Sequence, residues 1–154
     1  MIRLARPEDA DDVVRLLIGF RDWWGRDDPP EEAWRRGVPR LLADDLTDVL
    51  LGGGDPPTGV AVLRYRHSLW WDALDCNLED LFVEESARRT GLGEELVVAA
   101  IERAAARGCA RVELDVNESN AAAVALYEKL GFTSFSSELG GHNRFMRHYI
   151  ERRG

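Results

Sequence analysis

Two patterns of apolar and polar positions divide this chain into strands and helices. Short apolar or alternating runs bounded by turn residues predict strands at 1–5, 48–51, 59–65, 74–83 and 110–116, with weaker ones at 133–137 and 143–150. Apolar residues that recur every three or four positions predict helices from Pro7 to at least Phe20, at 31–46, at about 91–107, and from a cap at Ser119 to Leu130. The mixture of periods indicates an α/β protein.

The predicted elements follow one another as strand, two helices, three strands, helix, strand, helix and two strands. In such an order the helices have to cover both faces of one sheet, because each face carries apolar side chains that must be buried. The chain has 154 residues, and its strongest breaks, at 28–30, 52–57 and 140–141, are too short for domain linkers. We therefore expect one domain over 1–154.

Composition and charge narrow the functional classes. Apolar residues make up 45% of the chain and charged residues 31%, which is ordinary for a folded domain. We expect a cytoplasmic protein that does not enter a membrane, since neither a signal-peptide run nor about 18 consecutive apolar residues occur. The formal net charge of -8 argues against a nucleic-acid surface, and it suits either simple solubility or a cationic acceptor. Cys76 and Cys109 lack partners at metal-ligand spacing, so we expect no metal site.

The strongest local signal is an RxxGxG turn between an apolar strand and an amphipathic helix. It consists of Arg88, Arg89, Thr90, Gly91, Leu92 and Gly93. A helix start presents unpaired backbone N–H groups and the positive end of the helix dipole, and glycine lets an anion approach the backbone closely. The turn therefore predicts a pyrophosphate cradle. The same glycines could also serve only a tight connection between strand and helix.

A second motif follows one helix and one strand later, in the run NAAAVALYEKLGF at 120–132. RxxGxG followed by NxxAxxLYxxLGF at this separation resembles the GNAT superfamily of N-acetyltransferases. The resemblance is close over 78–132. It implies a three-layer α/β fold with a mixed, mostly antiparallel sheet flanked by helices. It further implies an acetyl-CoA donor, splaying of the strands that end near Val83 and Val116, and a homodimer.

The resemblance also assigns roles to single residues. It makes 88–93 the pyrophosphate loop, assigns Leu81, Phe82 and Val83 to the cofactor, and makes Asn120 a polar contact of the pantetheine arm. The Leu81 N–H is the candidate donor to the thioester carbonyl. Tyr127 becomes the general acid, since a phenol near the sulfur can protonate the departing thiolate. Asn120 could instead only cap its helix, and Tyr127 could be only a half-buried aromatic residue.

A third signal is the pair Glu79 and Asp80 inside an apolar strand. Successive strand side chains point to opposite faces, so the two carboxylates can share a site only if a bulge intervenes. Burial of a carboxylate favours either a functional role or firm hydrogen bonding to neighbouring backbone. The Leu-Glu-Asp run resembles that of spermidine/spermine acetyltransferases, which makes Glu79 the candidate base for the acceptor amine and Asp80 the second candidate.

The sequence gives weaker signals for the acceptor and its binding pocket. Five tryptophans occur, and those at Trp23, Trp24, Trp70 and Trp71 adjoin predicted loops that could wall an acceptor pocket or make core or dimer contacts. No cysteine is placed for a covalent acyl-enzyme, which favours direct transfer. The sequence therefore predicts an acetyl-CoA-dependent N-acetyltransferase for a small-molecule amine, with a polyamine-like acceptor as one option. A protein or peptide amine, or a non-catalytic acyl-CoA sensor on the same fold, remain alternatives.

Overall fold

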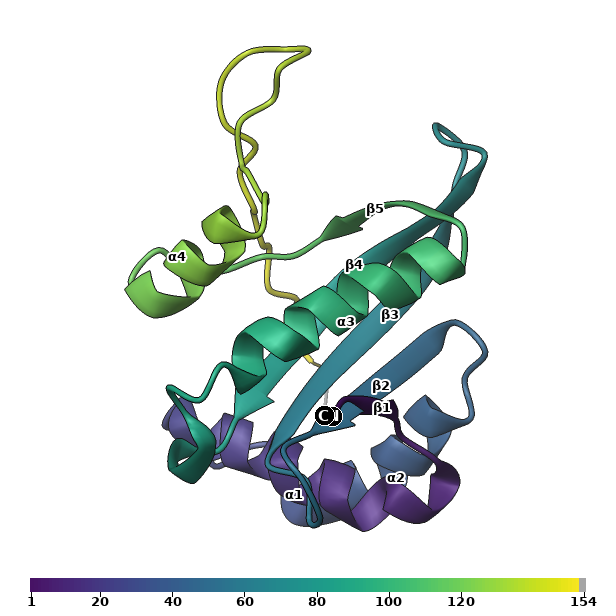
Figure 1. The fold of residues 1–154 in the computed structure, drawn as a ribbon, viewed down its shortest axis with the longest axis vertical. Helices are drawn as coiled ribbons and strands as arrows, with labels where there is room; N and C mark the ends of the chain where they lie inside the picture. The colour runs from purple at the N-terminus through teal and green to yellow at the C-terminus, as the bar shows by residue number, and fades with distance from the viewer. Residues whose placement is uncertain (153–154) are drawn as a thin grey trace. The chain divides into compact units, whose positions relative to one another are not determined.

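The computed structural model describes residues 1–152, and the chain falls into two compact units, Met1–Leu114 and Asp115–Gly154. The first unit holds the sheet and three helices (Figure 1). Its elements in chain order are β1 (Arg3–Leu4), α1 (Ala10–Trp23), α2 (Glu31–Leu42), β2 (Thr47–Gly52), β3 (Gly59–Ser68), β4 (Ala73–Val83), α3 (Leu92–Ala106) and β5 (Cys109–Glu113). The second unit holds α4 (Ala121–Lys129).

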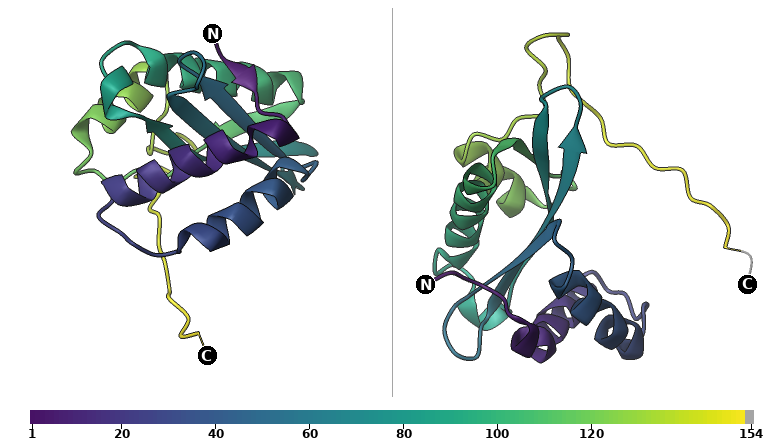
Figure 2. Two further views of the ribbon diagram at one scale, coloured as in Figure 1. Left: turned by 90° about the horizontal axis from the view of Figure 1, so that it is seen from below. Right: turned by 90° about the vertical axis from the view of Figure 1, so that its right-hand side faces the viewer.

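The five strands lie side by side in chain order, β1-β2-β3-β4-β5. Every neighbouring pair is antiparallel except β4 and β5, which are parallel and connected through α3. Helices α1 and α2 lie on one side of the sheet and α3 lies on the other (Figure 2). The predicted mixed, mostly antiparallel sheet with helices on both faces is therefore confirmed.

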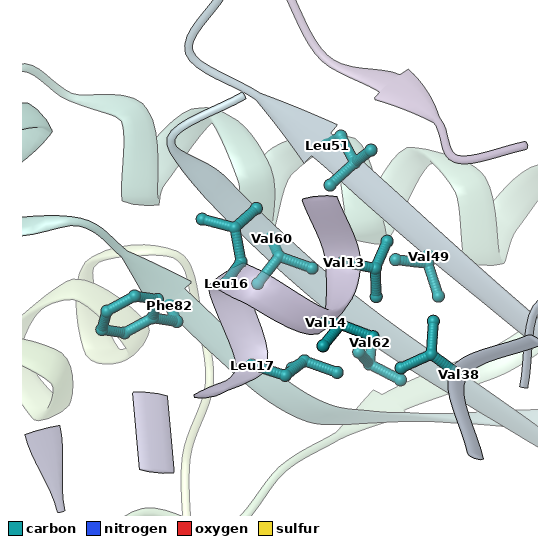
Figure 3. Packing of buried hydrophobic residues seen from close by; sticks show 10 residues of the cluster. All are labelled: Val13, Val14, Leu16, Leu17, Val38, Val49, Leu51, Val60, Val62 and Phe82. Carbon is teal, nitrogen blue, oxygen red and sulfur yellow. The ribbon is translucent and has the colours of Figure 1, made fainter. Parts of the chain in front are cut away.

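The two faces of β3 explain why helices cover both sides. Val60 and Val62 point toward α1, into a buried cluster that also contains Val13, Leu16 and Phe82 (Figure 3). The intervening residues point toward α3, whose own buried side chains include Leu96 and Ala100. Each fully buried aliphatic side chain contributes roughly 1.5–3 kcal/mol to folding. Strand β3 is thus a central strand buried on both faces, which holds β4 in a defined register.

An ion-pair network fastens α3 to the sheet. Asp48 of β2 accepts hydrogen bonds from Arg103 Nε at 2.7 Å and from the Tyr65 hydroxyl at 2.8 Å. Burial opposes ionisation of Asp48, but these two donors outweigh it and lower its pKa. Arg107 stacks on the Tyr65 ring, with its guanidinium carbon 4.1 Å from the ring centroid. The C-terminal half of α3 is therefore anchored, which orients the loop at its N-terminus.

A second ion pair anchors the start of α1. Asp9 accepts two hydrogen bonds from the Arg3 guanidinium, at 2.7 and 2.8 Å, and one from the Arg6 backbone N–H at 2.7 Å. The Arg3 bonds are the main cause that lowers the pKa of Asp9 to about 2. The carboxylate thus connects β1 to the one-turn helix Pro7–Asp9 that precedes α1.

We expect the stabilising effect of Asp9 to disappear in acid. The folded-state pKa lies below the unfolded value near 3.9, so the contribution is complete above about pH 4 and is lost as the pH falls toward 2. Urea unfolding of wild type and Asp9→Asn should therefore give a difference in free energy of unfolding at pH 7 that shrinks through this window. A difference that is constant with pH would contradict the assignment.

Two element ends differ from the sequence prediction. Helix α2 ends at Leu42 rather than at Leu46, because the Asp44 side chain accepts hydrogen bonds from the Leu46 N–H and the Thr47 hydroxyl. This local turn competes with further helix and starts β2. Strand β5 ends at Glu113, three residues before the predicted end at Val116.

The two weak strands predicted at 133–137 and 143–150 are wrong. The only β-structure within 115–152 is an isolated bridge between Phe135 and His142, closed by a turn with positive φ at Gly140 and Gly141. Residues 143–152 are exposed and carry no regular structure. Alternating apolar residues predict a strand only where a partner edge supplies the ladder hydrogen bonds, and a single bridge does not provide one.

Candidate active site

The edge of β4 that faces β5 is open along its second half. The two strands pair only from Leu74 with Cys109 to Asn77 with Glu113. Strand β4 nevertheless continues to Val83 against β3. No strand within residues 1–152 pairs with the 78–83 stretch on its outer side. The pairing of the two strands therefore stops well before the end of β4, as the predicted splaying requires.

The hydrogen-bond pattern determines which backbone groups face this open edge. The Glu84 N–H donates to the Thr58 carbonyl at 2.9 Å, so that pair is hydrogen-bonded. Bonded and non-bonded pairs alternate along an antiparallel ladder. Leu81, opposite Ala61, therefore belongs to a non-bonded pair, as does Val83. Their N–H and C=O groups point to the open edge, whereas those of Phe82 point toward β3.

A bulge in β4 brings the two candidate carboxylates to one face. Asp80 lies opposite Val62, but Leu78 lies opposite Leu63, which leaves Glu79 as the extra residue. Val62 faces α1, so Asp80 shares that face. The Glu79 carboxylate lies 3.5 Å from the Arg64 guanidinium, and Arg64 is two residues from Val62 and on the same face.

Glu79 is not buried, contrary to the expectation from its apolar neighbours in sequence. Its side chain is 45% exposed, because the extra residue of a bulge projects away from the packed ladder. Asp80 is half-buried. Arg64, which the sequence patterns did not single out, reaches Glu79 and also lies 3.6 Å from Asp44. Strand alternation with Val60 and Val62 could have placed Arg64 on this face.

The RxxGxG turn forms the start of α3. Gly91 is the N-cap residue, with φ +89°, and no side chain caps the helix there. A Cβ built on Gly91 would meet nothing within 4 Å, so the space in front of the turn is open. Arg89 also has a positive φ, of 61°. An uncapped helix start with two adjacent cations and open space fits an anion such as pyrophosphate.

Arg88 connects this turn to the end of β4. Its Nε donates a hydrogen bond to the Val83 carbonyl at 3.0 Å. Its guanidinium carbon lies 5.8 Å from the Phe82 ring centroid and 6.0 Å from that of Trp23. The Thr90 hydroxyl donates to the Ala87 carbonyl at 2.6 Å and tightens the turn. The sequence motif predicted the turn but not these aromatic contacts, because Trp23 belongs to α1.

The remaining two site residues lie in the second unit. The Asn120 side chain accepts a hydrogen bond from the Ala123 N–H at 3.3 Å and so caps α4. The predicted cap at Ser119 is wrong, since α4 begins at Ala121 and Asn120 is its N-cap residue. Tyr127 is half-buried and packs edge-on against Phe132, with ring centroids 5.7 Å apart. Burial raises the pKa of the Tyr127 phenol, and the charge of Asp115 raises it further. The phenol therefore stays protonated at neutral pH.

Comparison with known proteins gives consistent matches. The family described as "Acetyltransferase (GNAT) family" matches residues 13–132. A thialysine N-epsilon-acetyltransferase of Bos taurus is 27% identical over 151 residues, which cover 92% of this chain and 89% of that protein. Among solved structures, a protein of Arthrobacter sp. FB24 assigned as an acetyltransferase is 32% identical with a TM-score of 0.85, over 98% of this chain and 95% of that one.

An aminoglycoside N-acetyltransferase in complex with CoA shares the fold at a TM-score of 0.78 and 19% identity, over 97% of this chain and 93% of that chain. None of the helices within residues 1–152 is long and apolar enough to cross a membrane. The family match spans the open edge of β4, the turn before α3 and helix α4. This chain belongs to the acetyltransferase (GNAT) family and is an N-acetyltransferase.

Proposed function

We propose that this enzyme transfers the acetyl group of acetyl-CoA directly to an amine of a small molecule. The observation that carries the proposal is the open edge of β4, followed along the chain by an uncapped helix start with open space at Gly91. An extended pantetheine arm can pair with the open strand edge, and a pyrophosphate can bind at the helix start. Membership in a family of acetyltransferases supports this choice of donor.

The chain's own residues suggest how the donor would be held. The backbone of 88–93 would bind the pyrophosphate. Leu81, Phe82 and Val83 would line the pantetheine arm, with the N–H and C=O groups of Leu81 and Val83 directed to it. Asn120 would add a polar contact from α4, beside its role as a cap. When bound, acetyl-CoA supplies an activated acetyl thioester.

Three groups would then share the chemistry. Glu79, with Asp80 as the second candidate, accepts the proton that the acceptor amine must lose before it can attack. The Leu81 N–H provides a donor for negative charge that builds on the acyl oxygen. Tyr127 holds a phenolic proton for the departing thiolate, and its raised pKa keeps that proton available.

A polyamine-like amine is the acceptor that we favour. The Leu-Glu-Asp run in β4 supports it, as does a curated relative named for acetylating the N-epsilon amine of thialysine. A net charge of -8 favours encounter with a cation. We further propose that the enzyme acts in the cytoplasm.

A panel of amines with acetyl-CoA and a thiol-release readout tests the function. Diamines and polyamines should release thiol, and neutral alcohols of the same length should not. Millimolar CoA should raise the melting temperature, because a ligand that binds only the folded state stabilises it. CoA binding without thiol release from any small amine or peptide would favour an acyl-CoA sensor. Thiol release from peptides alone would move the acceptor to a protein amine.

Glu79→Gln should lower kcat/KM most at low pH. The variant cannot take a proton from an ammonium group, whereas raising the pH supplies the amine already deprotonated and should partly restore the rate. Asp80→Asn, one residue away on the same face, tests the second candidate base in the same assay. If Glu79→Gln kept the wild-type kcat/KM at every pH, Asp80 or a water molecule would be the base.

We also propose a homodimer. Phe145, Met146 and Ile150 in the C-terminal segment are exposed apolar side chains, and their burial against a second copy would favour association. Light scattering at high micromolar concentration should give twice the mass of one chain. A monomer under these conditions would refute the proposal.

A further inference from the structure

Four aromatic side chains gather where the end of α1 meets the end of β4. We call Phe20, Trp23, Trp24 and Phe82 the aromatic cluster. Phe20 stacks on Phe82 with ring centroids 5.6 Å apart, and Trp23 meets Trp24 edge-on at 5.2 Å. Trp23 and Trp24 are 47% and 52% exposed, although burying such large rings would be favourable. The aromatic cluster is therefore buried at Phe82 and exposed to solvent at Trp23 and Trp24.

The aromatic cluster lies on the same face of the sheet as the candidate base. Phe82 lies opposite Val60 and faces α1, as Asp80 does two residues earlier. Two residues along a strand span roughly 6.6 Å. A small molecule whose amine reaches Asp80 or the neighbouring bulge residue Glu79 could therefore extend another of its groups toward the aromatic cluster, in which Phe82 is buried and Trp23 and Trp24 are exposed.

The guanidinium group of Arg88 already contacts two rings of the aromatic cluster. The Arg88 guanidinium lies within 6.0 Å of the ring centroids of both Trp23 and Phe82. Cation–π attraction operates at this range and is strongest for tryptophan. Arg88 belongs to the turn that would bind pyrophosphate, so a bound anion would compete with the rings for its charge. The rings thus hold a cation that other ligands could replace.

The surroundings also favour positive charge. Helix α1 ends beside the aromatic cluster, and a helix C-terminus carries partial negative charge. Residues 21–28 contain three carboxylates against two guanidinium groups, and both guanidinium groups pair locally. Arg21 lies 2.7 Å from Asp22, and Arg26 lies 4.0 Å from Asp28. Arg88 balances the third carboxylate, so a ligand cation that displaces Arg88 from the rings would meet one uncompensated carboxylate there.

We propose that the aromatic cluster is a cation-binding subsite for the acceptor, and that Arg88 occupies it in the cofactor-free chain. The ligand is an ammonium or guanidinium group on the acceptor, other than the nitrogen that is acetylated. Its role in acceptor binding rests on the proposed function, whereas cation binding itself does not. Trp23 is the specificity-determining residue, since its ring is the most exposed one that Arg88 contacts.

Saturation-transfer NMR with tetramethylammonium tests cation binding directly, because this ion has no nitrogen that can be acetylated. We expect transfer in the cofactor-free protein, an increase of about threefold in affinity in Arg88→Met, and a loss of about tenfold in Trp23→Leu. Trp70→Leu, at a tryptophan that is 94% exposed in the turn after β3, is the matched control and should leave binding unchanged. The neutral 2,2-dimethylpropanol, of similar shape, should bind more weakly than the ion.

Equal binding of the ion and the neutral alcohol would overturn the proposal, because the cluster would then be only an apolar patch. Absence of transfer in both wild type and Arg88→Met would overturn it as well. With an amine that is acetylated, Trp23→Leu should raise KM for a diamine about tenfold but not for a monoamine of the same length. If no amine is acetylated, the proposed function is wrong, but the NMR result on cation binding still stands. If Trp23→Leu leaves the ratio of the diamine KM to the monoamine KM unchanged, the role of the cluster in acceptor binding is wrong, and the proposed function is unaffected.

Discussion

Replacement of Tyr127 by phenylalanine is expected to lower kcat about 100-fold and to leave the affinity for CoA nearly unchanged. The substitution removes only the phenolic proton and keeps the ring, so the edge-on contact with Phe132 persists. Burial, with the nearby charge of Asp115, raises the pKa of this phenol, which keeps its proton available for transfer. The rate loss should therefore be similar throughout the neutral and mildly alkaline range, in contrast to that of Glu79→Gln.

Tyr65→Phe is the matched control for this substitution. The Tyr65 hydroxyl donates a hydrogen bond to Asp48 in the network that anchors α3, on the opposite face of the sheet from Arg64 and Glu79. Its loss should lower the free energy of unfolding by about 1 kcal/mol and change kcat little. Steady-state rates and urea unfolding of both variants separate the two effects. If Tyr127→Phe retained the wild-type kcat, water rather than Tyr127 would protonate the thiolate.

Gly91→Val is expected to weaken CoA binding about 100-fold, which corresponds to the loss of about one hydrogen bond to a charged group. The Cβ would enter the open space in front of the turn, where the pyrophosphate is proposed to lie. The substitution also strains the backbone, because φ is +89° at this position. That strain costs about 1–2 kcal/mol of stability for a residue with a Cβ.

Gly108→Val separates the strain from the loss of the anion site. Gly108 follows the other end of α3 and has a φ of +77°, and a Cβ added to it would also meet nothing within 4 Å. Both variants should therefore lose similar stability, but only Gly91→Val should lose CoA affinity in calorimetry. If both folded variants bound CoA as tightly as wild type, Gly91 would only form the turn.

Local periodicity was sufficient to predict most of the elements around the site. Alternation in β3 and the helical stripe of α3 have the correct type and place, because each buries an apolar face that its own period defines. The turn at 88–93 was predicted equally well, since two glycines between an apolar strand and a helical stripe mark a turn for either use. The C-terminal strands failed for the converse reason: their stability depends on a partner edge that periodicity does not encode.

The arrangement of the candidate site depended on contacts between distant segments. The motif resemblance pointed to Glu79, Asp80 and Tyr127, but only the register of β4 against β3 decided that Glu79 is the extra residue of a bulge, exposed and beside Arg64. Likewise, Arg88 was predicted as part of a loop, whereas its contact with Trp23 required α1 to pack next to the end of β4. Sequence by itself thus determined the family, most of the elements and the glycine turn before α3, because these follow from short-range patterns. Tertiary structure alone decided which side chains share a face, since strand register and helix packing arise from residues far apart in the chain.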